Sequence, residues 1–161
     1  MTLLATNVLL ALSWAALWGS FDAVNLLSGF VLSFFALWFC RHLLGATGED
    51  RYFRATAQSC VLLGYFLKEL VKSCVLVARD CVAKDLDRIS PAIVKMPIGP
   101  KSDLEIFVLA NLITLTPGTL TLDVAEDRSF LLIHSIYAAD PEALVAELKS
   151  GMEHRVREVF R

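Results

Sequence analysis

The N-terminal segment constrains this chain most strongly, because it is almost free of charge. Between residues 1 and 48 the only charged side chains are those of Asp22 and Arg41, and all other Asp, Glu, Lys and Arg residues lie at Glu49 or beyond. The mean hydropathy of +0.58 is too high for an ordinary water-soluble domain. The apolar excess sits at one end, which predicts a membrane anchor followed by a more polar region.

Two apolar stretches make up this anchor. They cover residues 3–18 and 23–40, and the break Gly19-Ser20-Phe21-Asp22 separates them. The pattern predicts a hairpin of two membrane-spanning helices within residues 1–45, the first slightly short of the roughly 20 residues that a hydrocarbon core requires. Asp22 is expected to cap the second helix. Because no Lys or Arg precedes the first stretch, we interpret it as a retained helix rather than a cleaved secretory signal.

Small residues recur along both stretches at four-residue spacing. Such spacing lets helix backbones approach closely in a membrane, so these residues are predicted to pack against each other or against a helix of a partner protein. The positions are Ala11, Ala15 and Gly19 on the first helix and Gly29 and Ser33 on the second.

The segment from Ala55 to Arg79, within a predicted helix and linker at 52–88, is long enough to cross a membrane but carries Lys68, Glu69 and Lys72 near its middle. Three central charges cost roughly 9 kcal/mol on the insertion scale, whereas the apolar residues return about 6 kcal/mol. We therefore favour an amphipathic helix lying in the membrane interface over a third span, and both alternatives stay open. If the helix did span, these three residues would be candidates for ion transport.

Basic residues near the anchor predict its orientation. Arg41, Arg51 and Arg54 follow the second apolar stretch, and the turn between the two stretches has no basic residue. Because basic loops stay on the cytoplasmic side, both termini are predicted to be cytoplasmic.

Residues 89–161 change to short elements with turn residues between them, which predicts a small α/β domain of order β-α-β-β-α. Strands are expected at 92–98, 119–125 and 129–137, and helices from Ser102 to the Pro117-Gly118 turn and from Asp140-Pro141 onward. The first of these helices is apolar on both sides and is expected to be largely buried. Residues 119–125 alternate cleanly between polar and apolar, as in a half-buried strand.

Other function classes find little support. A net charge of -2 and the lack of a basic cluster argue against a nucleic-acid partner. The four cysteines, Cys40, Cys60, Cys74 and Cys81, form no metal or redox motif and are interpreted as small packing residues. The hydroxyl-rich stretch 113–123 and His134 offer the only nucleophile and base candidates of interest, but no known constellation orders them, so we expect neither an enzyme, nor a metal, nor a cofactor.

The run ANLITLTPGTLTLDV at residues 110–124 resembles the signature of the E subunit of Mrp-type cation/proton antiporters, also called Mnh or Pha. Further agreement extends along nearly the whole chain without a large insertion or deletion. It includes Gly29-Phe30-Val31-Leu32, Phe66-Leu67-Lys68-Glu69-Leu70, Ile133-His134 and Met152-Glu153. The signature positions that we single out are Asn111, Thr114, Thr116, Pro117, Gly118, Thr119, Asp123 and His134.

The resemblance implies a subunit of a multi-protein sodium/proton antiporter in the bacterial plasma membrane. In such complexes ion translocation belongs to large subunits that resemble respiratory complex I, and the E subunit resembles an accessory or assembly component. The expected partners are therefore the other subunits and the lipid bilayer, with no catalytic residue carried over. The competing hypotheses are a membrane-anchored adaptor with a cytoplasmic binding domain and a membrane-anchored enzyme.

Overall fold

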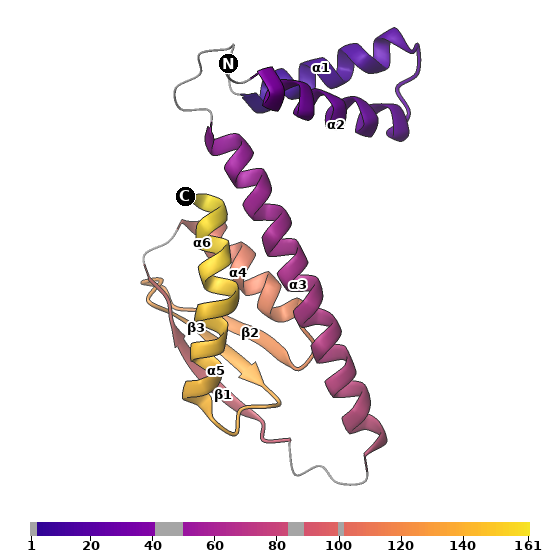
Figure 1. Ribbon diagram of the computed structural model, residues 1–161. Helices are drawn as coiled ribbons and strands as arrows, with labels where there is room; N and C mark the ends of the chain where they lie inside the picture. Colours follow the sequence, from indigo (N-terminus) through magenta and orange to yellow (C-terminus); the bar gives the residue numbers. More distant parts are fainter. Residues whose placement is uncertain (1–2, 41–49, 84–88, 100–101) are drawn as a thin grey trace. The chain divides into compact units, whose positions relative to one another are not determined.

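The computed structural model describes residues 3–40, 50–83, 89–99 and 102–161 (Figure 1). Arg41, on which part of the orientation argument depends, lies outside the described residues, as do 84–88 at the end of the predicted linker. The chain divides into two units, Met1–Thr56 and Ala57–Arg161, and the long helix α3 (Asp50–Val82) begins in one and ends in the other.

The first unit is built on a helical hairpin of α1 (Leu3–Leu17) and α2 (Ala23–Cys40). Gly19 occupies the turn with a φ of 64°, a conformation that side chains disfavour. Asp22 caps α2 as predicted, because its Oδ1 accepts a hydrogen bond of 2.7 Å from the backbone N–H of Asn25. The cap satisfies one of the N–H groups that a helix start leaves without a partner.

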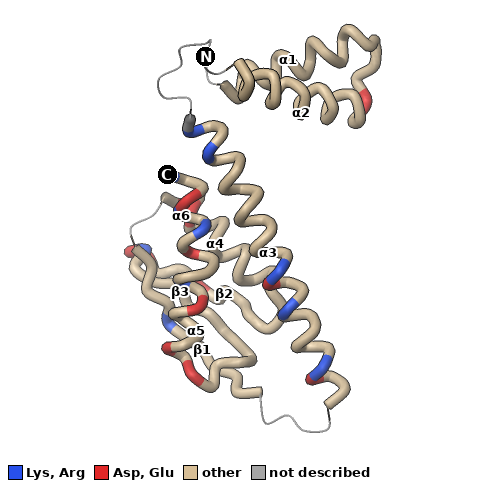
Figure 2. The backbone as a smooth tube through the Cα atoms, in the orientation of Figure 1, with Lys and Arg blue, Asp and Glu red and all other residues tan. Residues whose placement is uncertain are grey.

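The two helices differ in length. Among the described helices, α2 is long and apolar enough to cross a membrane at 18 residues, whereas α1 is apolar but has only 15. Figure 2 shows that both helices are almost without charged residues, in contrast to the rest of the chain.

The second unit is a two-layer α/β arrangement that confirms the predicted element order. A three-stranded antiparallel sheet has the order β1-β3-β2, and α4 and the C-terminal helical segment cover one of its faces. The elements are β1 (Ala92–Pro97), α4 (Asp103–Leu115), β2 (Thr119–Val124), β3 (Phe130–Ser135), α5 (Pro141–Leu148), the π-helical turn η1 (Lys149–Glu153) and α6 (His154–Phe160). Ser102 caps α4 and Asp140 caps α5, so both helices begin where they were predicted to begin.

The core of this unit lies between the sheet and the helices. Alternate residues of β3 point into it, and Leu131 and Ile133 are almost completely buried against Leu109 and Ile113 of α4 and Val156 of α6. Leu144, Leu148, Met152 and Val156 form the face of the last helix that packs on the sheet. No sequence pattern indicated the π turn that interrupts this helix.

Helix α3 packs on the α/β elements through one face. Leu62 belongs to the core, and the Tyr65 hydroxyl lies against Gly151 in the π turn, where a side chain would collide with it. The guanidinium of Arg155 lies 3.8 Å from the centre of the Tyr65 ring. Near the end of α3, the buried Asp80 accepts a hydrogen bond of 2.5 Å from the Tyr137 hydroxyl.

Two expectations about α4 and β2 are wrong for this chain. Helix α4 is only half buried, because Leu104, Phe107 and Leu115 stay exposed opposite the buried face. The register of β2 shifts between Thr121 and Asp123, so its alternation is interrupted by a bulge, and Leu120 and Leu122 are both exposed.

The cysteines are a further correction. Cys60, Cys74 and Cys81 are free and exposed on α3, whereas Cys40 is half buried. The three exposed cysteines therefore do not pack inside this chain.

The contact between Tyr137 and Asp80 leads to a pH prediction. The hydrogen bond to the carboxylate and the burial of the phenol raise the pKa of Tyr137 from 10.0 to about 12. The folded state thus holds this proton more tightly than the unfolded chain, so the contribution to stability is complete below pH 10 and is lost as the pH rises toward 12. Tyr137→Phe should cost about 1.5 to 3 kcal/mol near pH 8, because a charge-assisted hydrogen bond is lost and Asp80 stays buried.

The measurement is urea unfolding of the whole chain in detergent between pH 8 and 11.5. Unfolding is monitored through a backbone signal that does not depend on tyrosine ionisation. The wild type should lose stability more steeply than Tyr137→Phe above pH 10, the unperturbed tyrosine pKa. Parallel pH curves for the two proteins would contradict the assignment.

Candidate functional site

The signature residues 110–124 form the end of α4, a tight turn and the edge strand β2. Thr116 leaves the helical conformation as the C-cap, with φ −81° and ψ 121°. Pro117 cannot continue the helix, and Gly118 turns the chain with a φ of 94° that only glycine adopts without strain. The turn directs β2 back along α4 to pair with β3.

Threonine hydroxyls tie the strand to the helix. Thr116 Oγ1 donates to the Ile113 carbonyl oxygen at 2.7 Å, and Thr119 Oγ1 donates to the same oxygen at 2.6 Å. Thr121 Oγ1 donates to the Ala110 carbonyl oxygen at 3.1 Å. A helix leaves its last carbonyl groups without partners, and the hydroxyls of the signature supply donors at this end of α4. This explains why the stretch is rich in threonine.

The same residues close one of the two edges of the sheet, the edge formed by β2. Strand β2 has β3 on one side only, so its other backbone groups point outward. Thr114 Oγ1 accepts a hydrogen bond of 3.2 Å from the Thr121 N–H, Asp123 Oδ1 accepts one of 2.8 Å from the Val124 N–H, and the Thr119 N–H donates to the Thr116 carbonyl oxygen at 3.2 Å. Because these outward N–H groups already have partners within the chain, they are not available to pair with an added strand.

Asn111 and His134 lie apart from this network. The Asn111 side chain donates back to the Phe107 carbonyl oxygen at 2.7 Å and borders a shallow groove between α4 and β2. His134 lies on the face of the sheet away from the helices, paired in register with Ile93 and Leu120. The structure therefore does not bring His134 to the signature hydroxyls, and the two make no nucleophile and base pair.

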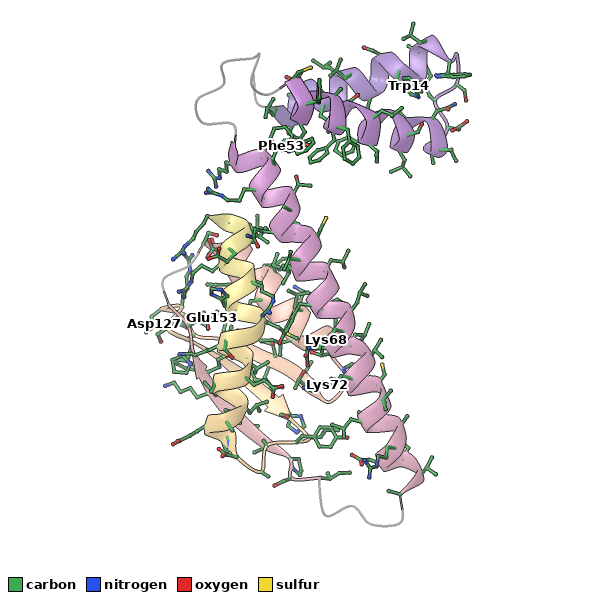
Figure 3. The ribbon with its side chains drawn as sticks, viewed as in Figure 1. Trp14, Phe53, Lys68, Lys72, Asp127 and Glu153 are labelled. Carbon is green, nitrogen blue, oxygen red and sulfur yellow. The ribbon has the colours of Figure 1, made fainter. Side chains whose placement is uncertain are left out.

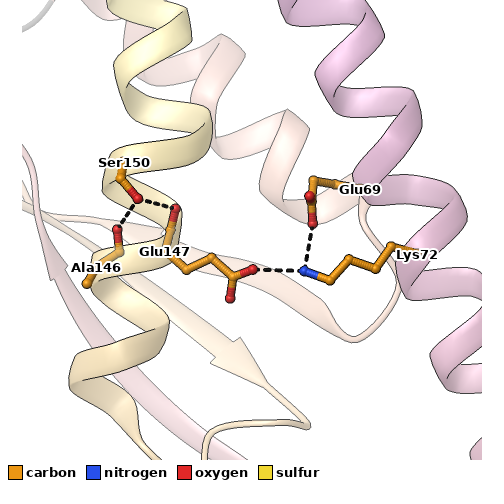
Figure 4. Close-up of polar contacts among 5 residues, drawn as sticks. All are labelled: Glu69, Lys72, Ala146, Glu147 and Ser150. Atoms are coloured by element: carbon orange, nitrogen blue, oxygen red, sulfur yellow. Dashed lines mark hydrogen bonds and ion pairs between the residues drawn. The ribbon is translucent and has the colours of Figure 1, made fainter.

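The charged residues of α3 form a surface bridge. Lys72 Nζ lies 3.3 Å from Glu69 Oε2 and 2.9 Å from Glu147 Oε1 of α5 (Figure 4). Hydrogen bonding to Glu147 raises the pKa of Lys72. Lys72 and Glu147 are both more than half exposed, so solvent screens the pair and its contribution is at most about 1 kcal/mol. Lys68 is exposed and takes no part in this bridge.

A cavity of about 150 Å³ lies between this bridge and the signature turn. Three hydroxyls of its lining are already engaged, because Thr116 and Thr119 bind α4 and the Tyr137 hydroxyl binds Asp80. Among the described residues, none of the buried polar atoms that lack a partner lines this cavity, so its geometry favours a structural role over ligand binding.

The small residues of the hairpin have different environments. Ala11, Ala15, Gly29 and Ser33 are buried between α1 and α2. A Cβ atom on Gly29 would lie 2.9 Å from Trp14 Cδ1 and 3.0 Å from the Ala11 carbonyl oxygen, so the backbones approach closely there. Figure 3 labels Trp14 on the hairpin. Gly19, by contrast, lies in the exposed turn and packs against neither helix.

A polar contact also joins the hairpin to the start of α3. Asn7 is completely buried and donates a hydrogen bond of 2.8 Å to the hydroxyl of Tyr52, at the start of α3. Phe53 packs beside it against Leu3 and Leu37. Sequence reasoning missed this contact, because neither Asn7 nor Tyr52 belongs to a recognisable spacing.

Comparison with known proteins identifies the family. A family model described as a Na+/H+ ion antiporter subunit matches residues 7–159. The chain belongs to this family. It is 32% identical over 155 residues to the E subunit of the Na(+)/H(+) antiporter of Alkalihalophilus pseudofirmus, covering 96% of each chain. It is 37% identical over 154 residues to the E1 subunit from Staphylococcus haemolyticus, covering 95% of this chain and 94% of that one.

Solved structures give related matches. A chain of an archaeal respiratory membrane complex, the membrane-bound sulfane sulfur reductase, is 26% identical with a TM-score of 0.59, and 98% of each chain is covered. A chain of the Mrp complex from Dietzia sp. DQ12-45-1b is 33% identical with a TM-score of 0.48, covering 62% of this chain and 92% of that one. This chain is thus a subunit of a multisubunit Na+/H+ antiporter, with other subunits as its partners in the cell membrane.

The signature turn predicts that Gly118 is required for stability. In Gly118→Ala the new side chain would be held at an unfavourable φ of 94°, and its Cβ would lie 3.2 Å from the Tyr137 ring. The cost should be about 1 to 3 kcal/mol. Gly64→Ala is the matched control, because its Cβ would meet nothing within 4 Å and alanine favours the helix. Chemical unfolding of both variants measures the difference, and equal stability would show that the turn tolerates a side chain.

Proposed function

We propose that this chain is an accessory and assembly subunit of the antiporter, which holds partner subunits together and carries no ions itself. Its anchor, residues 1–45, places two helices in the bacterial cell membrane. The region 52–88 does not cross the membrane, and residues 89–161 form a cytoplasmic domain.

The main support for this proposal is that the two hairpin helices lack charge and pack closely together. Charge is absent from the described residues of α1 and α2, and Asp22 is used as a cap at the turn. Ion paths through membranes need polar or ionisable groups facing a hydrated interior. Two helices in close contact along Ala11 and Gly29 enclose no such interior.

The packing of α3 supports a helix that stays outside the hydrocarbon core. Lys72 and Asp80 pair with Glu147 and Tyr137 of the α/β elements, and Glu69 pairs with Lys72 on α3 itself. If this part of α3 crossed the bilayer, the charged surface of those elements would enter it as well, at a cost of several kcal/mol. Lys68, Glu69 and Lys72 therefore act in packing and solubility rather than in transport.

Orientation is the part of the proposal that a labelling experiment can test alone. Arg51 and Arg54 follow α2 and favour a cytoplasmic second unit. In a cysteine-free background, Ser20→Cys should react with an impermeant thiol reagent in intact cells, and Ser129→Cys should react only after the cells are opened. Reaction of Ser129→Cys from outside would favour a third span.

Transport assays test the accessory role. The complete complex in proteoliposomes should exchange sodium for protons, and this chain alone should give no sodium-dependent proton flux above the leak of empty liposomes. A complex without residues 90–161 of this chain should assemble poorly, because the sheet and its helices are lost together. Flux through the chain alone would overturn the proposal and return Lys68, Glu69 and Lys72 to consideration as a transport site.

A further inference from the structure

The side of α3 that faces away from the α/β elements is apolar and exposed. We call this side the outer face of α3. It is free of charge from residue 57 to residue 82, over about 38 Å at a rise of about 1.5 Å per residue. Large members such as Leu67, Val71 and Val75 are 49%, 61% and 63% exposed. The outer face consists of Ala57, Cys60, Leu63, Gly64, Leu67, Val71, Cys74, Val75, Ala78, Cys81 and Val82.

Gly64 lies in the middle of the outer face, and nothing inside the chain requires a glycine there. Its backbone is helical, and a Cβ atom would meet nothing within 4 Å. Glycine in a helix interior makes the helix less stable than alanine does. No contact among the described residues compensates for this loss at Gly64. Gly151 and Gly29 differ in this respect, because a neighbouring side chain or backbone fills the space above each. A partner protein that packs closely against Gly64 would fill the space above it in the same way.

The spacing of the outer face fits a helix as its occupant. Positions alternate at intervals of three and four residues, which is the period at which two helices keep one seam in contact. The seam is Ala57, Cys60, Gly64, Leu67, Val71, Cys74, Ala78 and Cys81. Most of these side chains are small, which lets backbones approach closely.

A lipid surface fits the outer face less well. Helices that lie on membranes bury large residues such as Trp, Phe and Leu. The outer face holds no aromatic residue, and the neighbouring Tyr65 and Phe66 are half buried elsewhere on α3. Small side chains bury little area in lipid, so the same composition that favours a helix partner weakens membrane adsorption.

We propose that the outer face of α3 binds one apolar helix of another subunit of the antiporter complex. The inference rests on the proposed role of the chain in assembly and names the surface that performs it. Lys68 and Arg79 border the seam on one side, and neither makes an ion pair with a described residue. The partner helix should therefore carry acidic residues along that edge, where they would complement the two cations.

A substitution at Gly64 distinguishes between a partner helix and lipid as the occupant of the outer face. A Cβ atom at the exposed Gly64 would meet nothing within 4 Å, so the ring of Gly64→Phe should extend away from the chain and hold a partner helix away from the seam. The experiment purifies the complex through a tag on a large subunit and measures how much of this chain is recovered. Gly64→Phe should lose most of the recovered chain while its amount in the membrane and the protease resistance of its second unit stay normal. Ala143→Phe, at an exposed position of α5, is the matched control and should be recovered as well as the wild type.

The alternatives give different results. If lipid covers the outer face, Gly64→Phe will be recovered normally and will bind vesicles more tightly, which overturns the proposal. If the wild-type chain itself is not recovered with the large subunits, the proposed function fails rather than this inference. Normal recovery of Gly64→Phe with the wild-type chain present in the complex contradicts the inference alone.

The native cysteines provide a second readout. Cys60 and Cys74 lie in the seam and are exposed in this chain. In the assembled complex they should react with a maleimide many-fold more slowly than in the chain purified alone, whereas Ala143→Cys should react equally in both. A photoreactive residue at Val71 should crosslink to one partner subunit. Equal reactivity of Cys60 and Cys74 in both states, or a crosslink only to a second copy of this chain, would overturn the proposal.

Discussion

The attachment of α3 to the α/β elements is the interaction on which the rest of this molecule depends. Besides the apolar packing of Leu62 in the core and the stacking of Arg155 on the Tyr65 ring, it uses three contacts of polar side chains. These are the Tyr65 hydroxyl against Gly151, the bridge of Lys72 to Glu147, and the short hydrogen bond of Tyr137 to Asp80. Only the last joins a buried carboxylate to a partner distant in sequence, so it should contribute most. Because one face of α3 is committed in this way, the helix presents its opposite, apolar face outward.

The signature of the family acquires a physical meaning from the geometry. Residues 114–123 contribute the hydroxyl and carboxylate groups that satisfy both the end of α4 and the free edge of β2. A turn of this kind could be built with fewer polar residues, but the orphan carbonyl groups and the open edge would then remain available to other chains. The signature thus stabilises a small domain and keeps its edge closed, which suits a subunit that must bind chosen partners in a crowded complex.

The sequence predicted what local patterns determine. The caps Asp22 and Ser102, the start of the last helix at Asp140-Pro141 and the element order of the α/β unit all follow from short-range signals, and the structure confirms them. It could not predict which apolar face meets which neighbour. Helix α4 was expected to be buried because both its sides are apolar, yet Phe107 is 64% exposed because no described element of this chain covers it. The bulge in β2 and the contact of Tyr65 with Gly151 depend on long-range packing in the same way.

These discrepancies share a physical origin. The apolar pattern of a sequence reflects every interface that the chain forms, including those with other subunits. The structure of one chain buries only the residues of the internal interfaces. Leu104, Phe107 and Leu115 on α4 and the outer face of α3 are apolar in pattern but open in the chain. Exposed apolar area of this extent is unfavourable in water and is typical of interaction surfaces. For a member of a family of multisubunit antiporters, the residues that a folded chain fails to bury are therefore the best guide to where its partners bind.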